Sequence, residues 1–470
     1  MKENYIKQSP MLTLPSLGGG VNSTLVRIGG PTGNFWFAYL DSGQGDEHAH
    51  AVETDSNGNI YMCGKHPNGA VLVKWDTDGN VLWQIQHTGN MMLEWQGVAI
   101  DSTNNVWVTG SSWWITPPGG IVYRVMTAKY NSNGTLLQQK RFSTNSNPAY
   151  GMKGYGISVG SNNEVYVGYQ SEYPANPGGV IKNNLSSSWS AAQLSTEYAT
   201  TCTVNPNHTP SWGGDIGYTI SLSYNNTSGF QYGTYLIAQF DSNLSIQWSI
   251  LFGTGQGDGA TTEEGHDVVS LATNGELVVG CTLKGKVASY DAAVAKFSAT
   301  NGTFIWGRML GHSSDHLYSS GVALDSDGNV YSLIINQTQY SLVIAKWNAS
   351  GTLQWQREID SAGVEYGYGQ GIAVDNNGAV IITAISAGIT GQSGGRRSIV
   401  FKLPDDGSLT GTHGDFTYSI SNYTESTTVG HASSTSVWQQ TWSMSMFPFV
   451  WSNETYTSNS NNGTITLTSM

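Results

Sequence analysis

The sequence predicts an all-β fold: a seven-bladed β-propeller of four-stranded blades, with an N-terminal arm and a β-rich C-terminal tail. Three observations predict it. One motif recurs at intervals of 50 to 57 residues, each copy contains alternating apolar runs around tight turns, and the composition is rich in Gly and poor in charge. Self-similarity at such a period is typical of repeat architectures and outranks other sequence signals.

The recurring motif is an aliphatic run that ends in Lys or, once, in Gln. Its seven copies end at Lys74, Lys129, Lys182, Gln239, Lys296, Lys346 and Lys402. Five copies carry a Trp further on, at Trp83, Trp189, Trp248, Trp306 and Trp355, with a looser match at Trp189. A second pattern lies upstream, as in GVALDSDGNVYSLI at 321–334 and GIAVDNNGAVIITA at 371–384. The chain is therefore built from copies of one unit.

Each unit is predicted to hold four short strands. In 321–334, apolar residues alternate on both sides of Asp-Ser-Asp-Gly-Asn, which indicates two strands joined by a tight turn. The second half repeats this arrangement with the aliphatic run, a turn and the strand that holds the Trp. Small sheets of this kind packed around an axis form a propeller. A linear solenoid satisfies the repeat equally well, and only the chain ends argue against it.

The chain ends favour a closed ring. The last copy, IVFKLPDDGSLTGT, has no Trp in register, whereas an orphan Trp36 precedes Lys74 by 38 residues, close to the 40 between Trp306 and Lys346. We therefore expect the N-terminal strand to complete the last blade. The alternative is that FTYSI at 416–420 fills that place. The predicted regions are an N-terminal assembly arm (1–34), the propeller (35–420) and the C-terminal tail (421–470).

Composition agrees with an all-β body and limits the partners. The chain has 58 Gly in 470 residues and only 11% charged residues, which makes long helices unexpected. A formal charge of −13 disfavours nucleic acid, which needs a basic face. Cys63, Cys202 and Cys281 fall in different units and form no complete disulfide framework. We see no signal-peptide stretch and no membrane span, so we expect folding in a cytoplasm and no membrane insertion.

The tail differs in character from the repeats. It contains no Lys or Arg and is rich in Ser and Thr. Five aromatic residues fall within 14 positions: Trp438, Trp442, Phe447, Phe449 and Trp451. Aromatic surface on a charge-poor segment is costly to leave in water, so these residues are candidate assembly contacts. The alternation in GTITLTSM fits a strand added to a sheet edge. The edge belongs either to the same ring or to another subunit, and both alternatives stay open.

The Asp-rich turns at 55–59, 76–80 and 325–329 resemble the start of a calcium loop. Such a loop needs a carboxylate at its twelfth position, where this sequence has His66, His87 and Asn336. We therefore expect hairpin turns there, and no metal or other cofactor.

The segments that lead into the first strand of each unit converge near the axis of a propeller. Aligned on the Asp that follows, one position holds His48, Glu94, Lys153, Tyr318 and Tyr368. The position two residues later holds His50, Gln96, Tyr155, Ser320 and Gln370. Alternate residues of a strand point to one side, so both sets are candidates for ligand contact at the channel mouth. Solvation alone also selects polar residues there, and the residue types match no metal site.

The insert SSWWITPPGG holds Trp113 and Trp114. Two adjacent Trp residues on an exposed loop are candidates for stacking against a sugar. The alternative is that they cap a blade.

The repeats and both ends of the chain suggest a family. GIAVDNNGAV-type repeats, a last unit ending FKLPDDGSLTGTHGDFTYSI, the opening MLTLPSLGGG and the Ser/Thr-rich tail together resemble repeat-containing structural proteins of tailed bacteriophages, notably cyanophages. The resemblance implies a virion component of the tail, baseplate or fibre, synthesised in the host cytoplasm. It implies a propeller that acts as an adaptor or host-surface binding module, with termini that dock on neighbouring subunits.

The partners implied are other virion proteins, further copies of the chain and a host-surface glycan. Two other classes compete with this hypothesis. A carbohydrate-binding propeller would bind through exposed Trp113, Trp114 or Tyr residues. An enzyme acting on polysaccharide would need convergent acid, base or metal residues. We find no such set across the units, and the expectation from the sequence is a protein without catalytic residues that is not an enzyme.

Overall fold

The fold of this chain consists of strands throughout the part that the structure describes. A computed structural model of residues 1–470 describes residues 12–13, 22–28, 35–41, 46–67, 69–89, 92–116, 120–144, 152–160, 163–171, 179–183, 189–194, 217–223, 234–240, 246–253, 268–271, 276–284, 290–360, 371–386, 396–427, 438–441, 446–448, 451–454 and 465–469. Every regular element in these ranges is a strand, and none of them contains a helix suited in length and apolarity to crossing a membrane. The predicted all-β class and the antiparallel four-stranded repeats are confirmed.

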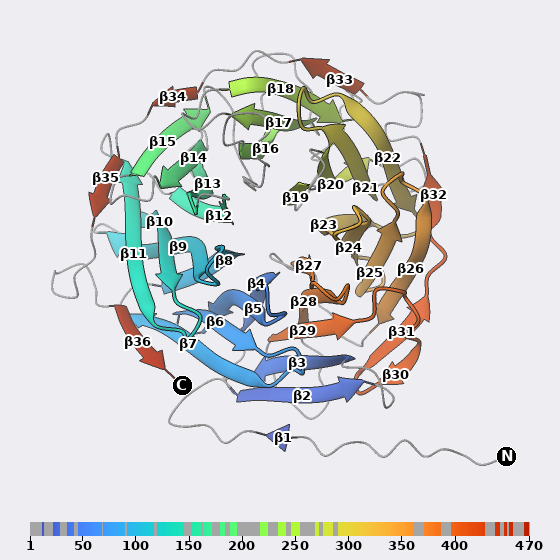
Figure 1. The fold of residues 1–470 in the computed structure, drawn as a ribbon, viewed down its shortest axis with the longest axis horizontal. Coiled ribbons are helices and arrows are strands. Elements are labelled where there is room, and N and C mark those ends of the chain that lie inside the picture. Colours follow the sequence, from blue (N-terminus) through green and yellow to red (C-terminus); the bar gives the residue numbers. More distant parts are fainter. Residues whose placement is uncertain are drawn as a thin grey trace.

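The strands form seven sheets, which we number by repeat. Sheet 1 contains β4 (His48–Thr54), β5 (Ile60–His66), β6 (Gly69–Trp75) and β7 (Val81–Gly89). Sheet 2 contains β8 (Met92–Ile100), β9 (Val106–Thr116), β10 (Gly120–Tyr130) and β11 (Leu136–Thr144). Sheet 3 contains β12 (Met152–Val159), β13 (Val165–Ser171), β14 (Gly179–Asn183) and β15 (Trp189–Leu194). In each, the four strands follow chain order from the centre of the molecule outward (Figure 1).

Sheets 4 to 6 continue the series. Sheet 4 contains β16 (Gly217–Ser223), β17 (Thr234–Phe240) and β18 (Ile246–Gly253). Sheet 5 contains β19 (Val268–Leu271), β20 (Glu276–Lys284), β21 (Tyr290–Ser298) and β22 (Phe304–Gly311). Sheet 6 contains β23 (Leu317–Leu324), β24 (Val330–Asn336), β25 (Ser341–Trp347) and β26 (Leu353–Asp360). The repeat residue Gln239 lies in β17, so β16 to β18 correspond to the second to fourth strands of the other sheets.

Sheet 7 joins the two ends of the repeat region. It contains β27 (Ile372–Val374), β28 (Val380–Ser386), β29 (Arg397–Leu403) and then β3 (Phe35–Asp41) from the start of the chain. Trp36 lies opposite Lys402, as Trp306 lies opposite Lys296 and Trp355 opposite Lys346. The Trp36 strand therefore takes the fourth place in this sheet, whereas residues 416–420 pair elsewhere.

The two ends of the chain add strands to the outer edges of all seven sheets. β2 (Asn22–Ile28) pairs with β3, and β1 (Leu12–Thr13) pairs with β2. The C-terminal segment begins with β30 (Gly411–His413) and β31 (Phe416–Ile420), and β31 pairs with β26 of sheet 6. It then runs backward through the sheets as β32 (Thr424–Ser426), β33 (Trp438–Thr441), β34 (Met446–Pro448), β35 (Trp451–Glu454) and β36 (Ile465–Ser469).

These strands pair with β22, β18, β15, β11 and β7, in that order, and lie on the outside of the ring (Figure 1). We call β31 to β36 the belt. β36 is the strand that the alternation of GTITLTSM predicts. Because the belt pairs with sheets of its own chain here, docking of the termini on neighbouring subunits stays a prediction.

The core lies between neighbouring sheets. One apolar cluster, with Tyr331, Ile359 and Phe401, joins sheets 6 and 7. A second, with Trp36, Trp75 and Ile381, joins sheets 7 and 1. Further clusters join sheets 1 and 2, 2 and 3, and 5 and 6. The apolar core is thus distributed among the interfaces between neighbouring sheets, because a sheet with apolar residues on both faces must be covered on both faces.

The Asp-rich turns are the predicted hairpin turns. In the turn between β4 and β5, Asp55 Oδ1 accepts hydrogen bonds from the backbone N–H groups of Asn57 and Asn59, and Oδ2 accepts one from Tyr61. Gly58 adopts φ +76°, a conformation that glycine reaches without a steric penalty. The carboxylate is thus occupied in closing the turn.

Candidate functional site

The repeated Lys and Trp residues join neighbouring sheets. Lys74 Nζ and Trp83 Nε1 both donate to the backbone oxygen of Ser132 in the next sheet, at 3.1 and 3.0 Å. Lys296 and Trp306 donate in the same way to Ala349, and Lys346 and Trp355 to Asp405. The acceptor is a carbonyl in the turn that follows the third strand of the next sheet. The motif that reveals the repeat is therefore structural.

The junction between sheets 7 and 1 uses the same contacts. Lys402 Nζ and Trp36 Nε1 both donate to the backbone oxygen of Thr77, at 3.1 and 3.2 Å. Asn376 Nδ2 adds a hydrogen bond of 3.1 Å to the backbone oxygen of Ser56. The N-terminal strand thus contacts the first sheet as the fourth strands of sheets 1, 5 and 6 contact their successors.

All these turns lie on one side of the ring, which we call the turn face. We call the opposite side, where the chain enters the first strand of each repeat, the entry face. Glycines permit close packing on the turn face: a Cβ atom on Gly351 would lie 2.8 Å from the Trp306 ring, and one on Gly407 would lie 2.7 Å from Trp355.

The first strands near the entry face carry a recurrent β-bulge. The pairing register shifts between Ala49 and Ala51, between Trp95 and Gly97, between Gly154 and Ile157, and between Ser319 and Gly321. The skipped positions include His50, Gln96, Tyr155 and Ser320, which are four of the five members of the second candidate set; the fifth, Gln370, lies outside the described residues. A bulge breaks the alternation of side chains. The expectation that the two sets share one side because they are two residues apart therefore does not follow.

The bulge explains two glycines in the second strands. A Cβ atom on Gly64 would lie 1.9 Å from the backbone oxygen of His48, and one on Gly110 would lie 1.9 Å from that of Glu94. No side chain fits at these positions, because the bulge brings a carbonyl group over the neighbouring strand. The two glycines thus leave room for the bulged first strands that carry the candidate residues.

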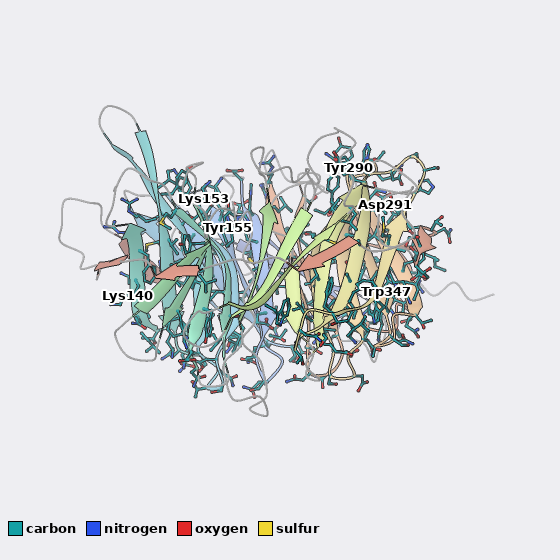
Figure 2. The ribbon with its side chains drawn as sticks, turned by 90° about the horizontal axis from the view of Figure 1, so that it is seen from above. Lys140, Lys153, Tyr155, Tyr290, Asp291 and Trp347 are labelled. Atoms are coloured by element: carbon teal, nitrogen blue, oxygen red, sulfur yellow. The ribbon has the colours of Figure 1, made fainter. Side chains whose placement is uncertain are left out.

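The candidate residues differ in their exposure. His50, Ser320 and Tyr318 are buried, with 5%, 3% and 5% of their surface exposed. His48, Glu94, Gln96, Lys153 and Tyr155 are partly exposed. Tyr368, Gln370 and Trp114 have no described side chain. In Figure 2, Lys153, Tyr155, Tyr290 and Asp291 lie toward the upper side of the ring, which is the entry face.

A further register position also lies on the entry face. It is the position six residues before the repeat Lys of the third strand. It holds Tyr123, Tyr290, Tyr340 and Arg396 in four of the repeats. Across the junction to the next sheet, Tyr123 contacts Lys153, with Nζ 4.2 Å from the ring centroid, and Tyr290 stacks on Tyr318 with centroids 5.2 Å apart. Sequence reasoning missed this position, although its spacing from the repeat Lys could have identified it.

At the junction of sheets 7 and 1 the corresponding contact is ionic. Asp46 lies 2.6 Å from Lys65, 3.0 Å from His48 Nε2 and 3.7 Å from Arg396. Partial burial opposes the ionisation of Asp46, but the hydrogen bonds and charges of Lys65 and His48 outweigh it and hold its pKa below the ordinary value. Burial lowers the pKa of His48 despite the nearby carboxylate. The ion pair of Asp46 with Arg396 joins the two sheets.

Trp113, Tyr123 and Lys153 form an aromatic and cationic cluster on the entry face. Trp113 and Tyr123 pair across β9 and β10, with ring centroids 5.7 Å apart, and Lys153 comes from sheet 3. All three side chains are partly exposed. A Cβ atom on Gly154 would lie 2.7 Å from Thr109 Oγ1, so this glycine allows sheet 3 to approach sheet 2 next to Lys153. The structure thus combines members of two separate candidate sets.

The cluster lies on an extension of the repeat. β9 and β10 have 11 residues each, whereas β5, β6, β24 and β25 have seven. The extra residues raise this hairpin above the other sheets on the entry face (Figure 2). Insertions in one repeat commonly mark the binding face of a repeat protein, because the repeat itself does not require them.

For three aromatic residues of the tail, the structure describes the backbone but not the side chain. Trp438 lies in β33, Phe447 in β34 and Trp451 in β35, on sheets 4, 3 and 2. Trp442 and Phe449 lie outside the described residues. The side chains of all five are likewise not described, so their role as assembly contacts stays a prediction.

Tyr423 anchors the start of the belt between sheets 5 and 6. Its hydroxyl accepts a hydrogen bond of 2.8 Å from Asn336 Nδ2 and donates one of 3.0 Å to Glu358. Gln356 bonds both the backbone N–H and the backbone oxygen of Tyr423. Nearby, Glu425 accepts a hydrogen bond of 2.8 Å from Trp347 Nε1. No sequence pattern predicts this anchor, since it depends on contacts between distant segments.

Comparison with known proteins supports the repeat and the fold class. A family model described as a beta-propeller repeat matches residues 305–332, and no curated protein matches the chain. The chain is similar to quinohemoprotein alcohol dehydrogenase ADHIIG from Pseudomonas putida HK5, at 11% identity over 83% of this chain and 74% of that chain, with a TM-score of 0.38. The phage resemblance finds no support in these matches and stays a prediction.

Two further solved structures are similar at the same level. A fungal alcohol oxidase in complex with copper has 12% identity over 85% of this chain and 76% of that chain, with a TM-score of 0.40. An α-L-arabinanase from Penicillium chrysogenum, complexed with arabinobiose, has 15% identity over 65% of this chain and 92% of that chain, with a TM-score of 0.34.

These matches correct one expectation. The sequence-based conclusion that the chain is not an enzyme is wrong, because the similar solved structures include enzymes. The reasoning failed because it required catalytic groups to recur at matching positions in the repeats, whereas a catalytic group needs to occur only once. At these identities and TM-scores, the likeness assigns no reaction to this chain.

Proposed function

We propose that the seven sheets are the blades of one closed seven-bladed propeller that serves as a rigid binding and adaptor module, and that its entry face binds a surface glycan. Trp113 and Tyr123 offer aromatic faces on which the apolar C–H face of a sugar ring packs, and Lys153 adds a hydrogen-bond donor. The contacts of Trp36 and Lys402 with Thr77 support closure, because they repeat those at other junctions.

The observation that carries this proposal is the position of the cluster. Trp113 and Tyr123 are the first cross-strand pair beyond the regular length of the repeat, and both side chains are partly exposed. The fold does not need the extension, since the corresponding hairpins of sheets 1, 6 and 7 end before it. Partly exposed aromatic residues on a dispensable extension are better explained by contact with a ligand than by stability.

The biological setting follows from the resemblance to tailed-phage structural proteins. In that setting the module is a component of the tail, baseplate or fibre, and the glycan belongs to the host surface. Other virion proteins and further copies of the chain are then its protein partners. The belt covers the fourth strands of the described sheets, so contacts with these partners do not use bare edges of the fourth strands.

Affinity electrophoresis of the full-length protein tests the glycan proposal. Native gels would contain dextran, agarose, alginate or polygalacturonate. We expect at least one polysaccharide to retard the wild type and Trp113→Ala to weaken the apparent affinity roughly tenfold. Leu82→Gln is the matched control, because Leu82 is an exposed apolar residue on the outer strand β7. Equal retardation of Trp113→Ala and the wild type would contradict the proposed site.

A further inference from the structure

Tyr340 occupies an unfavourable backbone conformation without compensating burial. Its φ angle is +56°, and 56% of its surface is exposed. The other non-glycine residues with positive φ in the described ranges are Asp46, Asn104 and Asn163, types that tolerate this region. A bulky residue in this conformation raises the free energy of the folded state, and an exposed side chain gains too little from packing to offset that cost. Backbone outliers of this kind point to a functional role.

The position of Tyr340 in the repeat is the same as that of Tyr123 and Tyr290. Each precedes the repeat Lys by six residues and lies on the entry face. Tyr123 belongs to the glycan site proposed above. Aromatic residues thus recur at one register position in sheets 2, 5 and 6, but the residues next to that position differ from sheet to sheet.

His316 connects Tyr340 with Tyr290. The His316 ring lies 5.6 Å from the Tyr290 ring. Its backbone N–H donates a 3.0 Å hydrogen bond to Thr338 Oγ1, and its backbone oxygen accepts one of 2.9 Å from Gln337 N. Thr338 and Gln337 belong to the same turn as Tyr340. The turn that carries Tyr340 is therefore fixed against the residue that contacts Tyr290.

We infer that Tyr290, His316 and Tyr340 form a second glycan-binding site at the junction of sheets 5 and 6. The Tyr rings provide stacking surfaces and the imidazole provides a hydrogen-bonding group for a hydroxyl. At the register position of Lys153 this junction carries Tyr318, which stacks on Tyr290, and Lys284 of β20 lies opposite Tyr290 in the backbone pairing. The inference rests on the proposed glycan function. Two sites on one rigid face raise the avidity for a polymer over that for a single sugar.

The test uses Tyr340→Asn in the full-length protein, with the same four polysaccharides in native gels. Asn tolerates positive φ, so the variant keeps or raises the melting temperature while it removes the ring. We expect the apparent affinity to fall roughly three- to tenfold. Tyr290→Ala should act in the same direction, and Leu82→Gln should have no effect.

The outcomes separate this inference from the function on which it rests. If Trp113→Ala weakens retardation and Tyr340→Asn does not, the second site is refuted and the first stands. If only Tyr340→Asn weakens retardation, the second site stands and the first is refuted. Wild-type protein that no polysaccharide retards would overturn both. A melting temperature that falls with Tyr340→Asn would show a structural role and also overturn the inference.

Discussion

At the residue scale, two buried histidines make stability depend on pH. His87 is 1% exposed and bonds the Tyr130 hydroxyl, and its ring packs on Trp95. Burial lowers the pKa of His87 from 6.5 to about 3 and that of His66 to about 4. Between pH 6.5 and these values the unfolded chain binds protons that the folded protein does not, so stability falls on acidification.

We therefore expect the free energy of unfolding to decrease as the pH falls from 7 toward 4, by up to about 1.4 kcal/mol per unit for each histidine. Glu53 opposes part of this, because burial raises its pKa from 4.5 to about 6 and acidification through that window favours the folded state. His87→Gln should flatten the slope in urea titrations at several pH values. An unchanged slope would show that His87 titrates normally in the folded protein.

Individual residues also show which parts of the structure could be predicted from the sequence and which could not. The repeat Lys and Trp were visible because each repeat needs the same contact to its neighbour. The role of Gly64 was not, because it depends on a bulge that forms only when two strands pair. Tyr123 and Tyr340 lay in register with a known motif, yet their importance rests on exposure and backbone angle, which the sequence does not contain.

At the element scale, the belt depends on its first crossing between sheets. Tyr423 is 7% exposed, and its hydroxyl satisfies Asn336 and Glu358. Removing that hydroxyl deletes both of its hydrogen bonds, although Asn336 still donates to Asp315 and Glu358 still accepts from Ser341. We expect the loss in this buried network to cost about 1–3 kcal/mol. We expect Tyr423→Phe to lower the free energy of unfolding by this amount in urea denaturation. Tyr340→Phe is the control, since it removes an exposed hydroxyl; equal effects of the two variants would contradict the anchor.

The elements of the repeats could be predicted, whereas the path of the belt could not. Alternating apolar residues and Asp-Gly turns identify strands because they reflect local burial and turn geometry. Pairing of β33 to β36 with four different sheets uses backbone hydrogen bonds at edges, and backbone groups are the same in every sheet. The sequence therefore showed that GTITLTSM joins an edge but not which edge.

At the scale of the whole molecule, the belt protects the sheets from pairing with other chains. Removing residues 428–470 would keep Tyr423 and Glu425 but bare the edges of β7, β11, β15 and β18. Bare edges promote association. We expect this truncated protein to form larger species than the full-length protein in light scattering after size exclusion. A full-length oligomer that becomes a monomer on truncation would instead show that the tail pairs with neighbouring subunits.

The function proposed for the whole molecule depends on glycan binding by the entry face through aromatic residues at the sheet junctions. The most direct test is a crystal structure of the full-length protein soaked with an oligosaccharide from the polysaccharide that retards it. We predict a sugar ring stacked on Trp113 and Tyr123 on the entry face. A sugar bound on the turn face or on the outside of the belt, with these rings unoccupied, would contradict the claim.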